Sequence, residues 1–165
     1  MMRRALVLAA ALLLSGCGLR PLYGGGSGSN VATTLRAVEV APIDGQVGWL
    51  VHNKLAERLV SNGPPAYRLE VELDDNITGF GIRGDSAATR ERRTLRARYR
   101  LIDVSNGAVV LDATAGSDAG IDVVSSQYAT VAAEQTALER LSEVVADQMV
   151  GRLAMFVTRT QPPVR

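Results

Sequence analysis

In the stretch TLRARYRL, Thr94–Leu101, apolar and polar side chains alternate without exception. Successive side chains of a β-strand point to opposite faces of its sheet, so this period of two predicts a strand. One face of the strand would carry leucine, alanine and tyrosine, and the other face would carry three arginines. A sheet with one apolar and one polar face needs a second layer of structure over its apolar side.

The segments on either side extend this strand into a sheet. Tyr67–Leu73 alternates in the same way, and Val109–Ala115 follows a turn at Asp103–Gly107. Three strands joined in this order predict an antiparallel meander. An earlier run rich in β-forming residues, Thr34–Ala41, is closed by Pro42 and predicts a further strand.

Two segments have the apolar spacing of helices that cover such a sheet. Val47–Val60 follows a possible N-cap at Asp44 and stops at the turn sequence Ser61–Pro65. Gln127–Val157 carries a longer apolar stripe, with acidic residues early and arginines late, as the helix dipole prefers. The order β-α-β-β-β-α predicts an α+β two-layer sandwich with two helices on one face of a mostly antiparallel sheet.

The start of the chain has the order of a secretory signal peptide. Arg3 and Arg4 precede the apolar run Ala5–Leu14, and the small residues Ser15 and Gly16 follow it. Ten residues of helix span about 15 Å, roughly half of a bilayer's hydrocarbon core, which is too short for a transmembrane anchor. The alternative is an N-terminal core helix, but nothing polar in the run makes an amphipathic face.

Cys17 is the single cysteine of the chain, so it has no partner for an internal disulfide. The sequence Leu14-Ser15-Gly16-Cys17 resembles the lipobox of bacterial lipoproteins. The resemblance implies that Cys17 carries diacylglyceryl and N-acyl chains, which would hold the protein on a membrane. Because Gly18 is not the aspartate associated with inner-membrane retention, we expect the outer membrane.

Composition then divides the chain into four parts. We expect a signal peptide at residues 1–16, a flexible Gly/Ser tether at 17–32, a single α+β domain at 33–158 and a disordered tail at 159–165. Without the signal peptide, 16 basic residues face 17 acidic ones. This balance argues against a nucleic-acid partner.

The residues needed for covalent chemistry are sparse. His52 is the single histidine, and no G-x-S-x-G nucleophile motif occurs. Gly79–Gly84 matches the spacing G-x-G-x-x-G, but a strand is expected after it instead of the helix that a dinucleotide site requires. Asp74 and Asp75 are adjacent on a strand, so they point to opposite faces and suggest solubilising charges. We therefore expect no enzyme, no cofactor and no metal site.

The candidate site is a cluster of six arginines within eleven residues, opposed there by Glu91 alone. Its members are Arg90, Arg92, Arg93, Arg96, Arg98 and Arg100. Alternation puts Arg96, Arg98 and Arg100 on one face at intervals of roughly 7 Å, a spacing suited to phosphates or carboxylates. The alternative is a solvated strand face on which these arginines pair with Glu70 and Glu72 of the neighbouring strand.

Two segments also resemble a known family. Gly16–Gly24, GCGLRPLYG, resembles the start of the LptE lipopolysaccharide-assembly lipoproteins of the α-proteobacterial type, with Leu19 in place of the usual aromatic residue. Ala132–Met149 is similar to that family's last helix. The resemblance implies a lipoprotein on the periplasmic side of the outer membrane.

That lipoprotein would plug the β-barrel LptD, assist its assembly and contact lipopolysaccharide, without covalent chemistry. The arginine cluster would then bind the phosphates of lipid A. The alternative function is an auxiliary envelope lipoprotein of another lipid-trafficking or ABC-type transport system.

Overall fold

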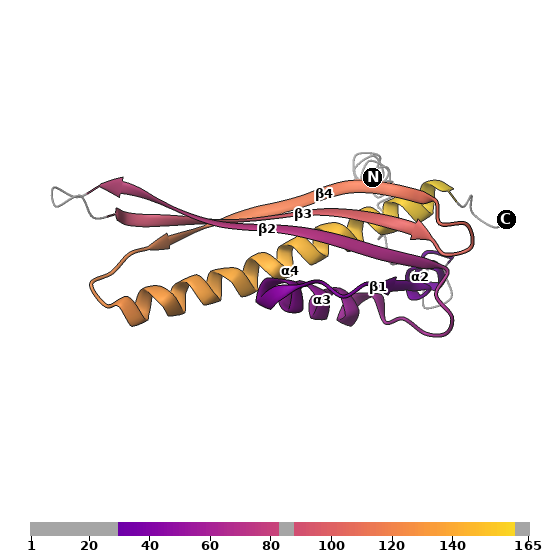
Figure 1. Cartoon of the computed structure of the whole chain (residues 1–165), viewed down its shortest axis with the longest axis horizontal. Coiled ribbons are helices and arrows are strands. Elements are labelled where there is room, and N and C mark those ends of the chain that lie inside the picture. The colour runs from indigo at the N-terminus through magenta and orange to yellow at the C-terminus, as the bar shows by residue number, and fades with distance from the viewer. Residues whose placement is uncertain (1–29, 83–87, 161–165) are drawn as a thin grey trace, which may run out of the picture.

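Three long antiparallel strands form one layer of the protein, and helices form the other (Figure 1). The computed structural model describes residues 30–82 and 88–160. In chain order the elements are α2 (Asn30–Arg36), β1 (Val38–Val40), α3 (Gly45–Leu59), β2 (Tyr67–Ile82), β3 (Ala88–Asp103), β4 (Val109–Asp122) and α4 (Gln127–Thr160). Residues 1–29, which include the expected signal peptide and Cys17, lie outside the described residues.

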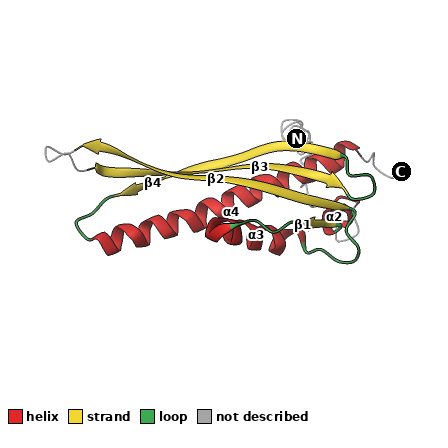
Figure 2. Cartoon of the chain, viewed as in Figure 1, coloured by secondary structure: helices red, strands yellow, loops and turns green. Residues whose placement is uncertain are grey.

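The sheet has the strand order β1-β2-β3-β4. Strand β1 runs parallel to β2 because α3 crosses between them, whereas β2, β3 and β4 form the predicted antiparallel meander. The helices lie along one face of this sheet, and α4 runs along most of its length (Figure 2). The predicted α+β sandwich, with its order β-α-β-β-β-α, is confirmed, and α2 is an additional short helix.

The core lies between the sheet and α4. Leu95, Ala97, Tyr99 and Leu101, the apolar face of the opening stretch, are all fully buried there. Helix α4 supplies the opposing side chains of this core from its predicted stripe, namely Leu141, Val145, Met149 and Leu153. Leu138, in the same stripe, is buried as well. A cluster of this size is the main source of stability for a domain of this length.

The first predicted strand, Thr34–Ala41, is wrong over its first half. Thr34–Arg36 belong to α2, and only Val38–Val40 pair with β2. Helical geometry turns Leu35 into the core, where it is buried together with Val38. Tertiary packing therefore outweighs the local preference for strand.

The other elements are longer than their periodicity predicts. Strands β2 and β3 each have 16 residues, and β2 includes Gly79–Ile82 of the glycine motif. Helix α2 starts inside the expected tether, and α4 continues to Thr160, two residues into the expected tail. Backbone pairing carries the strands past the point where apolar alternation ends.

The first long helix begins where it was expected to. Asp44 occupies the N-cap position of α3 with an extended backbone, although its side chain makes no capping hydrogen bond. None of the described helices combines the length and the hydrophobicity needed to cross a membrane.

Candidate functional site

Strand β3 presents five of the six clustered arginines on the sheet face that the helices leave uncovered. Because Leu95, Ala97 and Tyr99 point into the core, alternation sends Arg96 and Arg98 to the opposite side. The register aligns these arginines with outward positions on both neighbouring strands. We call the outward surface of β2, β3 and β4 the arginine face.

The arginine face carries as many acidic as basic side chains. Its basic residues are Arg68, Arg90, Arg92, Arg96, Arg98 and Arg100, and its acidic residues are Glu70, Glu72, Asp74, Asp112, Asp118 and Asp122. Six arginines against six carboxylates give these three strands a formal charge of zero on this side. The self-repulsion expected of a dense arginine row is thus offset by its neighbours.

Ion pairs join the strands across this face. The Nη2 of Arg100 lies 3.2 Å from Oε1 of Glu72 and 3.4 Å from Oε2 of Glu70, so the pairing expected with β2 is confirmed for this arginine. Arg98 instead forms a two-pronged contact with Asp112 of β4, at 3.2 Å from Nε and 2.9 Å from Nη2. This hydrogen bonding lowers the pKa of Asp112.

At the start of β3, Arg90 and Arg92 make different kinds of contact. Arg90 donates from Nε to Asp122 of β4 at 3.0 Å. Arg92 places its guanidinium 5.5 Å from the ring centre of Phe80, a cation–π contact, and has no carboxylate partner in the described part of the chain. Arg92 is therefore the outward arginine of the cluster whose charge is least engaged.

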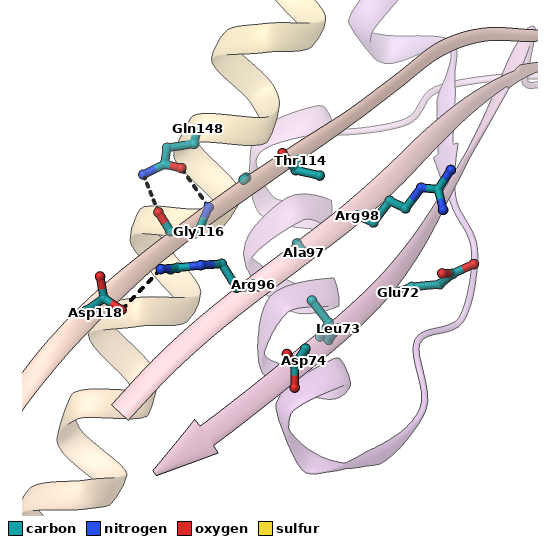
Figure 3. A pocket seen from close by; sticks show the side chains of 11 residues that line it. Glu72, Leu73, Asp74, Arg96, Ala97, Arg98, Thr114, Gly116, Asp118 and Gln148 are labelled. Carbon is teal, nitrogen blue, oxygen red and sulfur yellow. Dashed lines mark hydrogen bonds and ion pairs between the residues drawn. The ribbon is translucent and has the colours of Figure 1, made fainter. Parts of the chain in front are cut away.

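A shallow depression of about 740 Å³ lies at the middle of the face, around Arg96 (Figure 3). The Arg96 side chain crosses β4 and reaches Oδ1 of Asp118 and the carbonyl oxygen of Ser117, both at 3.3 Å. At the edge of the depression the Gln148 side chain from α4 bonds to both backbone groups of Gly116, at 3.0 and 3.3 Å. Gln148 thereby satisfies part of the otherwise open edge of β4.

Arg93 does not belong to this face, which corrects its inclusion in the candidate site. Its side chain points toward the helices, and its exposed fraction is only 11%. It donates to both carboxylate oxygens of Asp75, at 2.8 and 2.5 Å, and to the backbone carbonyl of Glu134 at 3.0 Å. Asp75 is therefore the inward partner of a largely buried ion pair and not a solubilising charge, whereas Asp74 points outward as alternation predicts.

The acids of β4 are the residues that sequence reasoning missed. Asp112, Asp118 and Asp122 hold Arg98, Arg96 and Arg90 in place of the β2 acids. All three acids are separated by even numbers of residues, which puts them on one face of a strand, but their register against β3 is needed to match each acid to an arginine.

The family of the chain is shown by a family model for lipopolysaccharide assembly, LptE, which matches residues 35–153. This range runs from α2 almost to the end of α4, and it includes the whole sheet and the arginine face. The chain belongs to the LptE family. That family is a non-enzymatic lipoprotein component of lipopolysaccharide transport, so the expectation of no enzyme is confirmed.

Relatives of this LptE-family chain support the same fold. A candidate lipoprotein from Caulobacter crescentus CB15 is 26% identical, with a TM-score of 0.68 over 82% of this chain and 100% of that one. The rare lipoprotein B from Shewanella oneidensis is 10% identical, with a TM-score of 0.56 over 74% and 96%, and shows the fold alone. An uncharacterised protein, RP188 of Rickettsia prowazekii, is 24% identical over 89% of this chain and 92% of its own length.

His52 and the first two glycines of the G-x-G-x-x-G motif lie within regular secondary structure of this LptE-family protein. His52 lies half-buried on α3. Gly79 and Gly81 are part of β2, and the last two residues of their motif fall outside the described residues. No group of three or more potential metal ligands occurs among the described residues.

Proposed function

We propose that this protein is the outer-membrane lipoprotein subunit of the lipopolysaccharide translocon. Acylated at Cys17, it seats its folded domain in the lumen of the β-barrel LptD, assists assembly of that barrel and contacts lipopolysaccharide. The observation that carries the proposal is the family match over residues 35–153, because it covers the helical layer and every strand.

The arginine face fits the polar interior of a large barrel. The lumen of an outer-membrane barrel is polar, in contrast to its lipid-facing outside. Five of the six arginines of this face, all except Arg92, already pair with carboxylates. Most of the face can therefore approach such a wall without burying an unpaired charge, which is the costly outcome. The strands of this face are 14 to 16 residues long, so it offers an extended contact surface.

The same face supports a contact with the phosphates of lipid A. The side chains of Arg90, Arg96 and Arg98 are at least half exposed, although each holds a carboxylate. Exposed ion pairs contribute only about 0 to 1 kcal/mol, so a phosphate with two negative charges can compete with the carboxylate. We assign this contact to the five outward arginines and leave out Arg93, whose donors are engaged internally.

The proposal is tested by purifying the tagged, full-length lipoprotein from its native envelope in mild detergent. We expect a large outer-membrane β-barrel protein in a one-to-one ratio, identified by mass spectrometry. Recovery of the lipoprotein alone, or with inner-membrane transporter subunits, would contradict the translocon role and favour an auxiliary lipoprotein of another transport system.

The lipid contact is tested separately with the triple variant Arg96→Gln, Arg98→Gln, Arg100→Gln. Glutamine removes the charge without setting further carboxylates among the six that remain. We expect weaker binding of purified lipopolysaccharide, with the barrel partner retained. A matched control replaces three arginines of the helices by glutamine, Arg36, Arg152 and Arg159, and equal losses in both variants would show a general charge effect and remove the assignment.

A further inference from the structure

A second hollow lies in the helical layer, away from the arginine face. It occupies about 400 Å³ between α3 and α4, a volume within the range of roughly 300 to 1,000 Å³ that small-molecule sites take. Trp49 of α3 forms part of its wall with 62% of the residue exposed. Trp49 is the single tryptophan of the chain. An indole this exposed offers a flat apolar surface to a ligand.

Several polar side chains that line the hollow have no hydrogen-bond partner in the described part of the chain. The amide of Asn53 and the guanidinium of Arg140 make none there, and both line the hollow. Ser142 also lines the hollow; it is completely buried, and its Oγ has no hydrogen-bond partner among the described residues. The amide of Asn53 and the guanidinium of Arg140 are therefore available to a ligand in this hollow.

The charges around the hollow argue against an anion. Lys54 and Arg140 are its two basic residues, and they are opposed by Glu57, Glu139 and Glu143. The Nζ of Lys54 already lies 3.6 Å from Glu57. Glu143 is likewise paired, at 3.5 Å from Nη2 of Arg58, so the remaining charges of Arg140 and Glu139 cancel and give an anion no net attraction. A neutral ligand with many hydroxyl groups can donate to carboxylates and accept from amide and guanidinium groups.

We propose that the hollow between α3 and α4 binds a neutral saccharide, with one sugar ring stacked on Trp49. Asn53 and Arg140 donate hydrogen bonds to ring hydroxyl groups, and Glu139 accepts one from them. The C–H face of a sugar ring is apolar while its rim is polar, which matches an indole wall flanked by these groups. The inference rests on this hollow alone and does not require the barrel partner or the lipid contact.

The single tryptophan makes the test direct, because the intrinsic indole fluorescence of the whole chain reports on this hollow. Detergent-solubilised full-length lipoprotein is titrated with two probes: a β-1,4-linked tetramer of N-acetylglucosamine, and dephosphorylated core oligosaccharide released from lipopolysaccharide. We expect a saturable change in fluorescence with one of them below about 10 mM. A response to the tetramer identifies a cell-wall type of glycan, and a response to the core identifies the sugar of a lipid.

Variants show whether the response comes from this hollow. Asn53→Ala and Arg140→Ala should each weaken binding at least about fivefold, the effect of one lost hydrogen bond. Trp49→Ala should abolish saturation-transfer NMR signals from the bound sugar. Tyr128→Ala is the matched control, since Tyr128 is an aromatic residue of α4 that is 85% exposed and outside the hollow. Binding that survives Trp49→Ala, silence with both probes, or an equal response to inorganic phosphate would overturn the proposal.

Discussion

Arg96 passes directly over Gly116 on its way across β4. A Cβ atom at Gly116 would stand 2.5 Å from Cδ of Arg96, 2.9 Å from its Nη1 and 3.0 Å from the carbonyl oxygen of Leu95. The absence of a side chain at this position therefore opens the path by which the guanidinium reaches Asp118 at 3.3 Å (Figure 3).

Gly116→Ala should displace Arg96 and destabilise the fold by about 1 kcal/mol, through an off-rotamer arginine and a lost ion pair. Gly120→Ala is the control on the same strand and face, because a Cβ there meets nothing within 4 Å. Gly120→Ala should be neutral or slightly stabilising, since glycine in the middle of a strand is less favourable than alanine. Urea unfolding of both variants measures the difference, and equal midpoints would show that Arg96 moves aside without cost.

Arg93→Met should destabilise the protein by about 3 kcal/mol, because it leaves the carboxylate of Asp75 unpaired and largely buried. The double variant with Asp75→Leu should recover part of the loss, since neither charge then remains. Arg98→Met, on the exposed face, should change the unfolding midpoint far less. If the double variant is as unstable as the sum of both single variants, the pair is not coupled in the way the geometry indicates.

The pKa of Asp118 lies below its ordinary value of 3.8, chiefly because Thr94 donates a hydrogen bond to it, at 2.8 Å, with a smaller contribution from Arg96. A lowered folded-state pKa contributes stability that is present above the unfolded pKa and is lost as pH falls through the folded value. Thr94→Val should therefore raise the Asp118 pKa and reduce the loss of stability below about pH 4. An NMR titration of the Asp118 carboxyl group in each variant measures this pKa. Arg96→Gln should raise the pKa of Asp118 less than Thr94→Val does.

Two of the helical glycines, Gly48 and Gly151, should respond to alanine in opposite ways. A Cβ at Gly48 would stand 2.5 Å from the backbone oxygen of Ile43, which cannot move aside easily, so we expect a loss of about 2 kcal/mol. A Cβ at Gly151 meets nothing within 4 Å, so the better helix propensity of alanine should stabilise α4 by up to about 1 kcal/mol. The unfolding temperatures of the two variants measure this difference. Shifts in the same direction for Gly48→Ala and Gly151→Ala would contradict the close packing of Gly48 against Ile43.

Cys17→Ser should release the protein from the envelope membranes, because the lipid chains proposed there need the thiol. Fractionation of the periplasm and membranes, with metabolic labelling by a fatty acid, measures both effects. Wild-type protein should carry the label and sediment with the outer membrane. A labelled, membrane-bound serine variant would exclude Cys17 as the acylation site.

The sequence alone was sufficient to predict an element wherever the periodicity of apolar side chains within one segment decides its secondary structure. Tyr67, Leu69 and Leu95 alternate with charged residues, so the strands and their apolar face are predictable before any contact is known. Leu138 and Leu153 follow helical spacing, so α4 and its buried stripe are predictable as well. Element ends were less predictable, because Leu35 becomes helical only when it has α4 and the sheet to pack against.

The sequence by itself determined the two-layer architecture, the order of its elements and the side of β3 on which Arg96, Arg98 and Arg100 lie, since these depend on residue periodicity within one segment. Only the tertiary structure decided which acid holds each arginine, that Arg93 faces inward to Asp75, and that α3 and α4 leave a hollow beside Trp49. Those contacts join segments far apart in the chain, and their register follows from how the whole layer of helices packs on the sheet.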